Sequence, residues 1–151
     1  MDQERILCVT VYIINEKNEF LFLHHKKLGK WLPAGGKVEP TETPDESLHR
    51  EVFEETGLEI NLIGEGDTPV DGGLAKPWGV QLNRVSPIRD HVDLVYVGVP
   101  KKSNAQPILN EREAFAIEWV SVDKIDAIDT FPSVRQWVQL IDDSGVLGAA
   151  F

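Results

Sequence analysis

The N-terminal part of the chain contains two short apolar runs separated by a polar segment. Residues 6–14 are rich in β-branched and aromatic side chains, a pattern that predicts a buried strand. Residues 15–19 are polar and predict a turn, and residues 20–24 predict the returning strand of a hairpin. We predict two loops after this hairpin, a basic one at residues 26–30 and one with two adjacent glycines at residues 31–36.

The next segment carries the start and stop signals of an α-helix. Thr43 occupies the N-cap position and Pro44 the first helical position, and Glu46 completes a capping box with Thr43. Gly57 is a natural left-handed C-cap. We therefore predict a helix that begins at residue 44 and ends near residue 56.

The remaining pattern is that of an α/β protein. Glycines and prolines interrupt residues 64–86, which predicts loops with one strand near residues 80–85. Other expected elements are strands at residues 58–63, 91–99 and 116–120, a helical turn at 121–125 and a helix at 133–141. We predict one domain over residues 1–144, built as an α/β sandwich with a mixed sheet, and a poorly ordered tail over residues 145–151.

Composition and charge exclude several classes of function. The chain has 151 residues with 15 basic and 25 acidic side chains, a net charge of −10, which argues against binding long nucleic acids or anionic membranes. Cys8 is the only cysteine, so no intramolecular disulfide and no cysteine-based zinc site can form. The N-terminus lacks the layout of a signal peptide, and no apolar run approaches a membrane span. We therefore expect a cytoplasmic protein.

The predicted helix presents three carboxylates on one face. Glu51, Glu54 and Glu55 are spaced i, i+3 and i+4. Their mutual repulsion, close to the negative end of the helix dipole, disfavours this arrangement unless a cation offsets it. Hard cations such as Mg²⁺ prefer such oxygen ligands. The alternative is a solvated acidic face without function.

Residues 36–58 follow a pattern with fixed spacing, and its defined positions are Gly36, Glu42, Arg50, Glu51, Val52, Glu54, Glu55, Gly57 and Leu58. In this respect the chain resembles the Nudix hydrolases, whose signature it matches at every defined position without insertion. The resemblance implies a Nudix-type α/β/α sandwich with a mixed central sheet. It also implies a Mg²⁺-dependent hydrolase, with Mn²⁺ as a possible substitute, that cleaves the diphosphate linkage of a nucleoside diphosphate derivative.

The resemblance also implies roles for individual residues. The implied metal ligands are the carboxylates of Glu51, Glu54 and Glu55 and the carbonyl of Gly35. We call residues 36–58, which carry this signature, the Nudix box. Its other defined positions have structural roles: Glu42 and Arg50 would pair to fix the helix to the preceding loop, Gly36 would permit the loop, and Gly57 would end the helix. Water would attack a phosphorus atom, and metal ions would polarise the phosphoryl oxygens and orient the water.

Residues outside the box complete the predicted site. Family members often take a general base from a loop glutamate, here predicted as Glu113, and some use a box glutamate such as Glu54. Lys27 could meet substrate phosphates or be a solvated loop residue. Trp78 could stack on a base, or it could simply cover the core. His91 and Asp93 share one face of a predicted strand, where they could line the cleft or lie at the core edge.

Two alternatives remain open at the level of sequence. The first is a non-catalytic Nudix-like domain for nucleotide sensing or protein binding, against which the complete set of box glutamates argues. The second is an enzyme that processes RNA ends, against which the net charge of −10 argues. The downstream residues that mark ADP-ribose and diadenosine substrates in the family are absent, so the small-molecule nucleotide stays unspecified. A homodimer is compatible with the sequence.

Overall fold

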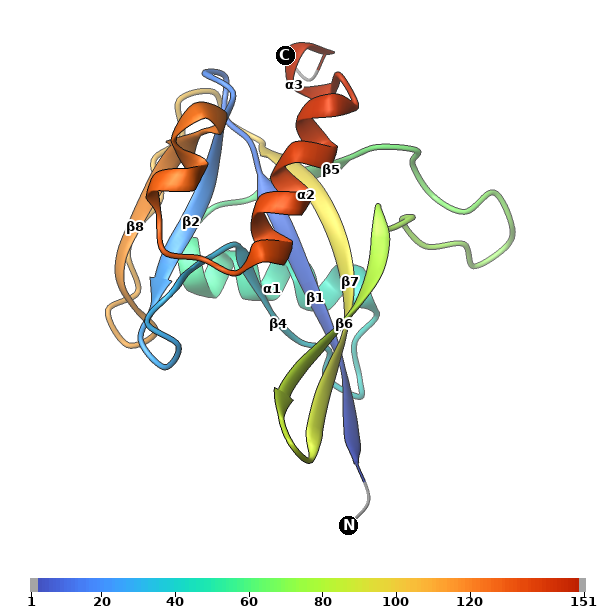
Figure 1. The fold of residues 1–151 in the computed structure, drawn as a ribbon. Helices are drawn as coiled ribbons and strands as arrows, with labels where there is room; N and C mark the ends of the chain where they lie inside the picture. The colour runs from blue at the N-terminus through green and yellow to red at the C-terminus, as the bar shows by residue number, and fades with distance from the viewer. Residues whose placement is uncertain (1–2, 150–151) are drawn as a thin grey trace.

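The computed structural model describes residues 3–149, and residues 1–2 and 150–151 lie outside that description (Figure 1). The described chain forms β-strands, α-helices and one 3-10 helix, in the order β1 (Glu4–Ile13), β2 (Glu19–His25), β3 (Trp31–Leu32), β4 (Ala34–Lys37), α1 (Pro44–Thr56), β5 (Ile60–Ile63), β6 (Gly79–Ser86), β7 (Arg89–Pro100), β8 (Ala114–Ser121), η1 (Val122–Ala127), α2 (Pro132–Asp143) and α3 (Val146–Ala149). No helix in this part of the chain is long and apolar enough to cross a membrane.

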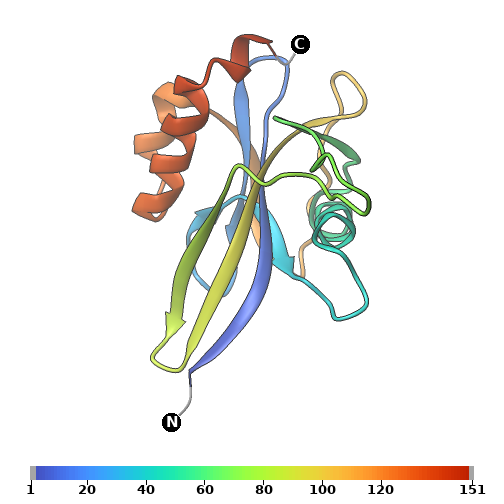
Figure 2. The same cartoon turned by 90° about the vertical axis from the view of Figure 1, so that its right-hand side faces the viewer.

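Two β-sheets form the centre of the fold. In the five-stranded sheet the order is β4-β1-β7-β5, and β6 also pairs with β7. This sheet is mixed, because β1 and β7 run parallel while β4, β5 and β6 are antiparallel to their neighbours. A smaller antiparallel sheet has the order β3-β2-β8. Helices α1 and α2 lie on opposite sides of the larger sheet (Figure 2), as predicted for a mixed α/β sandwich. The smaller sheet was not predicted.

The hydrophobic core is divided between the two faces of the larger sheet. On one face, Leu48 and Val52 of α1 are fully buried and belong to the same cluster as Val9 and Val11 of β1. On the other face, the buried side chains of α2 cluster with Phe22 and the other aromatic residues around it. Each such apolar side chain contributes about 1.5–3 kcal/mol by its burial. The α1 cluster therefore fixes the helix that carries the acidic residues.

Helix α1 begins and ends as the sequence predicts. The Thr43 hydroxyl accepts a hydrogen bond from the Glu46 amide at 3.3 Å, and the Glu46 carboxylate accepts one from the Thr43 amide at 3.1 Å. Gly57 closes the helix in the left-handed conformation, with φ 70°, and its amide donates to the Phe53 carbonyl. These local bonds set the length of the helix and thus which turn carries the glutamates.

Three expectations from the sequence differ from the structure. Apart from one bridge between Ile14 and Phe20, β2 does not pair with β1, because both edges of β1 are already occupied by β4 and β7. The predicted loop at residues 31–36 contains β3 and β4, which pair with neighbouring strands. The expected disordered tail contains α3, in which Leu147 is buried against the α2 cluster. Residues 150–151 of that tail lie outside the described residues.

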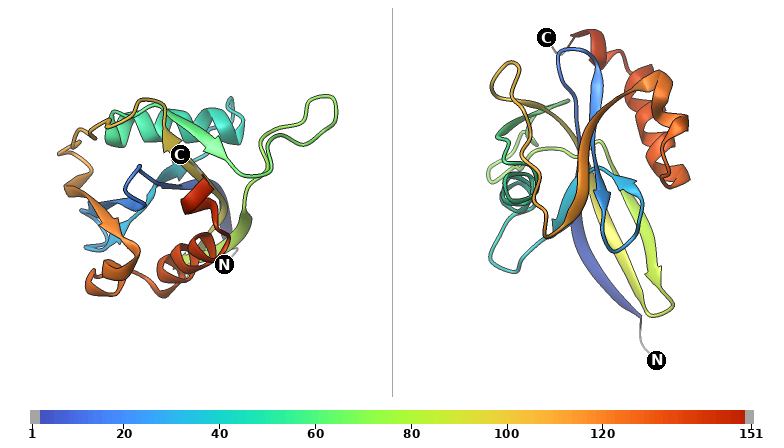
Figure 3. Two further views of the ribbon diagram at one scale, coloured as in Figure 1. Left: turned by 90° about the horizontal axis from the view of Figure 1, so that it is seen from above. Right: turned by 90° about the vertical axis from the view of Figure 1, so that its left-hand side faces the viewer.

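The segment between β5 and β6 is the largest irregular part of the fold. It projects away from the body of the molecule when the structure is viewed from above (Figure 3). Two backbone contacts with the rest of the chain tie it down, from the Ala75 amide to Asp45 of α1 at 3.4 Å and from the Trp78 amide to the Val95 carbonyl at 2.7 Å. The prediction of loops followed by a strand near residues 80–85 is confirmed by β6.

Candidate active site

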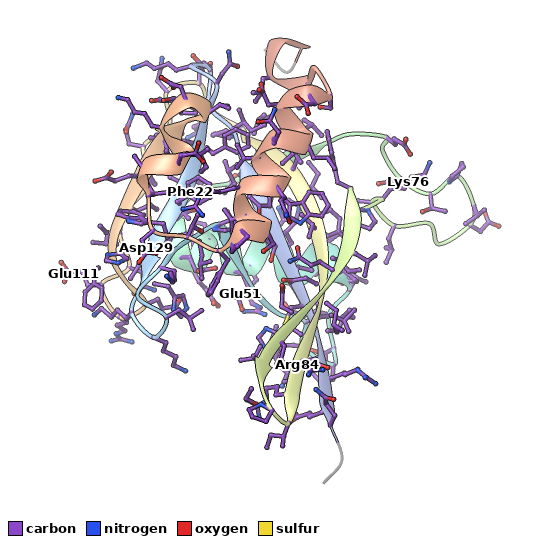
Figure 4. All side chains as sticks on the ribbon, in the orientation of Figure 1. Phe22, Glu51, Lys76, Arg84, Glu111 and Asp129 are labelled. Atoms are coloured by element: carbon purple, nitrogen blue, oxygen red, sulfur yellow. The ribbon has the colours of Figure 1, made fainter. Side chains whose placement is uncertain are left out.

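The three glutamates of α1 differ strongly in exposure. The side chain of Glu54 is 49% exposed, that of Glu51 is 16% exposed, and Glu55 is buried. All three lie in the last two turns of a helix that packs against the edge strand β4. The acidic face is therefore not a uniformly solvated surface, because Glu55 is buried and Glu51 is largely so. In Figure 4 the labelled Glu51 lies near the middle of the molecule, whereas Glu111 lies at its periphery.

Strand β4 approaches these carboxylates through its two glycines. The Gly35 amide donates to the Glu55 carboxylate at 3.0 Å. A Cβ atom on Gly36 would lie 2.4–2.7 Å from the carboxyl atoms of Glu51, so the Glu51 side chain would have to move. A Cβ atom on Gly35 would meet the backbone carbonyl of Val9, which cannot move aside as a side chain can, so only glycine fits at that position.

The expected pair of Glu42 and Arg50 is present. Arg50 Nε donates to both carboxylate oxygens of Glu42, at 3.1 and 2.9 Å, and its Nη2 donates to one of them at 3.0 Å. These hydrogen bonds are the main reason that the pKa of Glu42 lies below its ordinary value. Arg50 Nη1 also contacts Glu51 at 2.9 Å and Glu54 at 3.3 Å. Arg50 thus joins the loop to the helix and partly neutralises the acidic face.

Burial and mutual repulsion disfavour charge on the inner glutamates. Burial raises the pKa of Glu55 to about 8, with further increases from the charges of Glu51, Glu113 and Glu54, while the Gly35 amide opposes the shift. Burial likewise raises the pKa of Glu51, although Arg50 opposes this effect. Four carboxylates therefore lie within electrostatic reach of one another.

The donor set fits a hard divalent cation. Carboxylate oxygens and a peptide carbonyl are the ligands that Mg²⁺ and Mn²⁺ prefer, and a cation would reverse the unfavourable field at Glu55. Across residues 3–149, no three His, Cys, Asp or Glu side chains are already placed around one metal position. The physical reason is that Glu51 and Glu54 are turned toward Arg50, and Glu55 is turned toward the Gly35 amide.

Glu113 and Lys27 lie in turns next to strands of the smaller sheet. Glu113 is exposed just before β8, and its charge acts on Glu51, Glu55 and His25. Lys27 is exposed in the loop after β2, and its charge lowers the pKa of the His25 imidazole. Burial is the main cause of the low pKa of His25. The charge of Glu113 thus acts on two of the box glutamates, whereas that of Lys27 acts on His25.

Trp78 packs against the core in the structure, which is one of the two roles that the sequence left open for it. Its indole N–H donates to the Ile63 carbonyl at 2.9 Å, and a Cβ on Gly64 would lie 2.7 Å from that nitrogen. The ring packs against the core cluster beneath α2, and it lines a cavity of about 420 Å³ beside the α2–α3 junction. None of the residues lining that cavity comes from α1. The bond to Ile63 thus ties the loop to β5.

Polar side chains of β1, β6 and β7 form a strip, of which only Asp93 could be named from the sequence. Thr10, Gln81, Asn83 and Asp93 are all partly buried on the face of the larger sheet that α2 covers. The available signal was the alternation of β6, in which Val80 and Leu82 are exposed while the residues between them are polar and partly buried. Strand pairing then places these side chains beside Asp93, which no local pattern reveals.

The mixed α/β fold, with an acidic helix packed on a glycine-containing strand, is the arrangement expected from the sequence resemblance. The profile of the NUDIX domain matches residues 4–141 of the chain. The chain is 38% identical over 149 residues to a putative 8-oxo-dGTP diphosphatase of Bacillus subtilis, with 92% of this chain and 89% of that protein covered. It is 29% identical over 110 residues to putative 8-oxo-dGTP diphosphatase 2 of Mycobacterium tuberculosis, with 73% and 67% covered.

Solved structures agree with this match. A Nudix-family hydrolase from Clostridium perfringens superposes with a TM-score of 0.76 at 25% identity, covering 91% of this chain and 99% of the other. The MutT protein from Methanosarcina mazei superposes with a TM-score of 0.72 at 29% identity, covering 96% and 98%. The chain belongs to the Nudix hydrolase family, and the fold and the enzyme class predicted from the motif are confirmed.

Proposed function

We propose that the chain hydrolyses a nucleoside triphosphate to the nucleoside monophosphate and pyrophosphate. In this reaction a water oxygen forms a bond to phosphorus, the bridging P–O bond breaks, and a proton leaves the water. Support comes from relatives named as 8-oxo-dGTP diphosphatases, from a nucleoside triphosphatase of Enterobacter that is 28% identical, and from an oxidised purine nucleoside triphosphate hydrolase of Mus musculus that is 26% identical.

The observation that carries the proposal is the unfavourable electrostatic environment of the buried Glu55 carboxylate. A buried carboxylate whose pKa is raised to about 8 by burial and by three neighbouring glutamates is unfavourable in a purely structural helix. The strand beside it has no side chain at Gly36, so the glutamate side chains of α1 can reach past the strand. A phosphate chain accompanied by divalent cations would offset this concentration of negative charge.

The proposed metal ligands are the carboxylates of Glu51, Glu54 and Glu55 and the carbonyl of Gly35. Bound Mg²⁺ would polarise the phosphoryl oxygens and lower the pKa of the attacking water. Arg50 holds Glu51 and Glu54 in place from the opposite side, and the Gly35 amide orients Glu55. These contacts limit the movement that the carboxylates need in order to converge.

Glu113 is proposed as the group that takes the proton from water. It lies in the turn before β8, whereas the box glutamates belong to α1, and its charge acts on two of them. Both the backbone N–H and the backbone C=O of Glu113 are hydrogen-bonded. The N–H donates to the Asn110 carbonyl at 3.1 Å, and the C=O accepts from the Lys26 amide at 3.2 Å. An exposed carboxylate on a fixed backbone can reach water at the site without a large rearrangement.

The test is a panel of 8-oxo-dGTP, dGTP, ATP, ADP-ribose and UDP-glucose at pH 8.5 with Mg²⁺ or Mn²⁺. Release of pyrophosphate and monophosphate is followed for the native protein and for Glu54→Gln. A lost metal ligand costs several kcal/mol of transition-state stabilisation, so we expect kcat/KM to fall by at least about 100-fold.

Glu59→Gln is the matched control. Glu59 is an exposed glutamate just after the same helix, and its substitution removes the same charge without affecting the box. Turnover of a triphosphate that survives Glu59→Gln and is lost in Glu54→Gln would support the proposal. Nucleotide binding without turnover on the whole panel would overturn it in favour of a sensing domain.

A further inference from the structure

A continuous chain of side-chain hydrogen bonds crosses the larger sheet beneath α2. Trp137 Nε1 of α2 donates to Gln81 Oε1 at 2.6 Å, and Gln81 Nε2 donates to Asn83 Oδ1 at 2.8 Å. Asn83 Nδ2 donates to Asp93 Oδ2 at 2.6 Å, and Thr10 Oγ1 donates to Asp93 Oδ1 at 3.0 Å. This series of hydrogen bonds thus connects Trp137 of α2 to the Asp93 carboxylate.

The direction of these bonds is fixed by the chemistry of the two ends. An indole N–H can only donate, and an ionised carboxylate can only accept. Both amides between Trp137 and Asp93 must therefore point their N–H groups toward Asp93. Because the carboxylate has about four acceptor positions and two are occupied, about two positions remain for another donor.

The carboxylate is oriented more tightly than core packing requires. Asp93 is partly buried, and burial raises its pKa while the bonds from Thr10 and Asn83 oppose that shift. A partly desolvated carboxylate forms stronger charge-assisted hydrogen bonds than an exposed one. Asp90 on the same strand provides a contrast, because it is fully buried and contacts Arg84 at 3.2 Å and Arg5 at 3.6 Å. Asp93 forms no ion pair of this kind among residues 3–149, although the charge of His91 on the same strand also lowers its pKa.

The strip and the acidic helix lie on opposite faces of the larger sheet and are connected through strands β1 and β4 at its edge. Thr10 lies opposite Gly35 in the β1–β4 pairing, and the Gly35 amide binds Glu55. The Cys8 thiol, opposite Asp93 in the β1–β7 pairing, has its pKa raised to about 11, chiefly by burial and also by the charges of Asp93 and Glu51. Asp93 and Glu51 are thus both close to one thiol. From β4 to β7 is two strand spacings, roughly 10 Å.

We propose that Asp93 is a specificity residue that accepts hydrogen bonds from the nucleobase, and that it selects bases with adjacent N–H donors, as in guanine. This inference rests on the proposed hydrolysis of a nucleoside triphosphate at the acidic site. Guanine presents its ring N1–H and its exocyclic amine side by side, and both can donate to one carboxylate. Adenine presents an acceptor at ring N1, which repels the carboxylate. Thr10 and Asn83 hold Asp93 in the orientation that this recognition needs.

The expected magnitude follows from the number of hydrogen bonds. A two-point contact to a base edge discriminates by about 1–3 kcal/mol, or roughly 5- to 150-fold in kcat/KM. Inosine lacks the exocyclic amine and keeps N1–H, so it should fall between the other two purines. We therefore expect the native protein to prefer GTP to ITP and ITP to ATP, with at least about tenfold between the first and the last.

The test compares kcat/KM for GTP, ITP and ATP in the native protein, in Asp93→Asn and in Asp90→Asn. Asp93→Asn is expected to lower the value for GTP at least about tenfold and to leave that for ATP within about threefold. Asp90→Asn removes a carboxylate from the same strand and should keep the GTP-to-ATP ratio. Titration calorimetry with GMP and AMP in the absence of metal gives a second measurement that needs no hydrolysis.

The binding and turnover measurements test base selection and hydrolysis separately. Preferential binding of GMP that is lost in Asp93→Asn supports base selection even where no triphosphate is hydrolysed, so the proposed reaction and the proposed specificity can fail separately. Equal binding of GMP and AMP by the native protein overturns the inference. A uniform loss on all three triphosphates in Asp93→Asn, with the ratio kept, shows that the strip only ties α2 to the sheet. If Asp93→Asn does not fold, the native protein and Thr10→Val provide the test. Preference for GTP over ITP and for ITP over ATP in the native protein, with a lower GTP-to-ATP ratio of kcat/KM in Thr10→Val, supports the proposal. Equal values for the three triphosphates in the native protein overturn it.

Discussion

Glu55 is expected to make the stability of the metal-free protein fall as the pH rises. Its side chain is buried, and its pKa is raised from an ordinary 4.5 to about 8, mainly by burial. In the unfolded chain the same carboxyl loses its proton near pH 4.5. Between these two pH values the folded chain holds one more proton than the unfolded chain, so the free energy of unfolding decreases with increasing pH. The stability is fully present below about pH 4.5 and is lost progressively up to about pH 8.

The structure sets an upper limit on this effect. The pKa rises from 4.5 to about 8, a difference of about 3.5, and each pKa unit corresponds to about 1.4 kcal/mol, which gives about 5 kcal/mol. Structural relaxation and water entry reduce such values, so we expect about 2–5 kcal/mol. Glu55→Gln isolates the effect, because glutamine resembles the protonated acid and keeps an oxygen for the Gly35 amide.

Urea unfolding in EDTA at pH 5, 6.5, 8.5 and 9 measures the prediction. The native protein and Glu55→Gln should be almost equally stable at pH 5, and the variant should be more stable by about 2–5 kcal/mol at pH 8.5. Added Mg²⁺ should raise the stability of the native protein at pH 8.5 more than that of the variant, because it binds the folded carboxylates. Parallel pH profiles for the two proteins would refute the reasoning about Glu55. An equal gain from Mg²⁺ in both would refute its role as a ligand.

Three substitutions around α1 give further expectations. Gly36→Ala would place a Cβ 2.4–2.7 Å from the Glu51 carboxyl group, so we expect kcat/KM to fall about 100-fold at unchanged helix content by circular dichroism, and near-native activity would contradict this. Arg50→Lys loses the bidentate hydrogen bonds to Glu42, which should lower the free energy of unfolding in urea by about 1–3 kcal/mol. It should also raise the Mg²⁺ concentration required for half-maximal activity. An unchanged urea midpoint would contradict the first expectation. Thr43→Ala removes the N-cap and should cost about 1 kcal/mol without changing kcat/KM, whereas a matching loss of activity would place the cap in the site.

The local elements could be predicted because their signals lie close together in the sequence. The capping box at Thr43 and the left-handed turn at Gly57 fix both ends of α1 through contacts within four residues. The same spacing places Glu51, Glu54 and Glu55 on one side of the helix. The strands of residues 6–14 and 91–99 and the helix of residues 133–141 likewise appear within a few residues of their predicted bounds.

The pairing of the strands could not be predicted from local pattern. β1 pairs in parallel with β7, more than 80 residues away, and its other edge pairs with β4. That arrangement excludes the expected hairpin with β2 and turns the glycine loop into an edge strand. Trp78 illustrates the same limit for a side chain, because only the fold places the Ile63 carbonyl within reach of its indole N–H.

The sequence by itself determined the family and the acidic helix, because these depend on the spacing of residues within one short segment. Only the tertiary structure decided that Glu55 is buried, that Gly35 must lack a side chain, and that Asp93 receives bonds from both Thr10 and Asn83. These three properties arise where segments distant in sequence come into contact. Burial, close approach and hydrogen-bond direction belong to such contacts and have no counterpart in the local pattern of the chain.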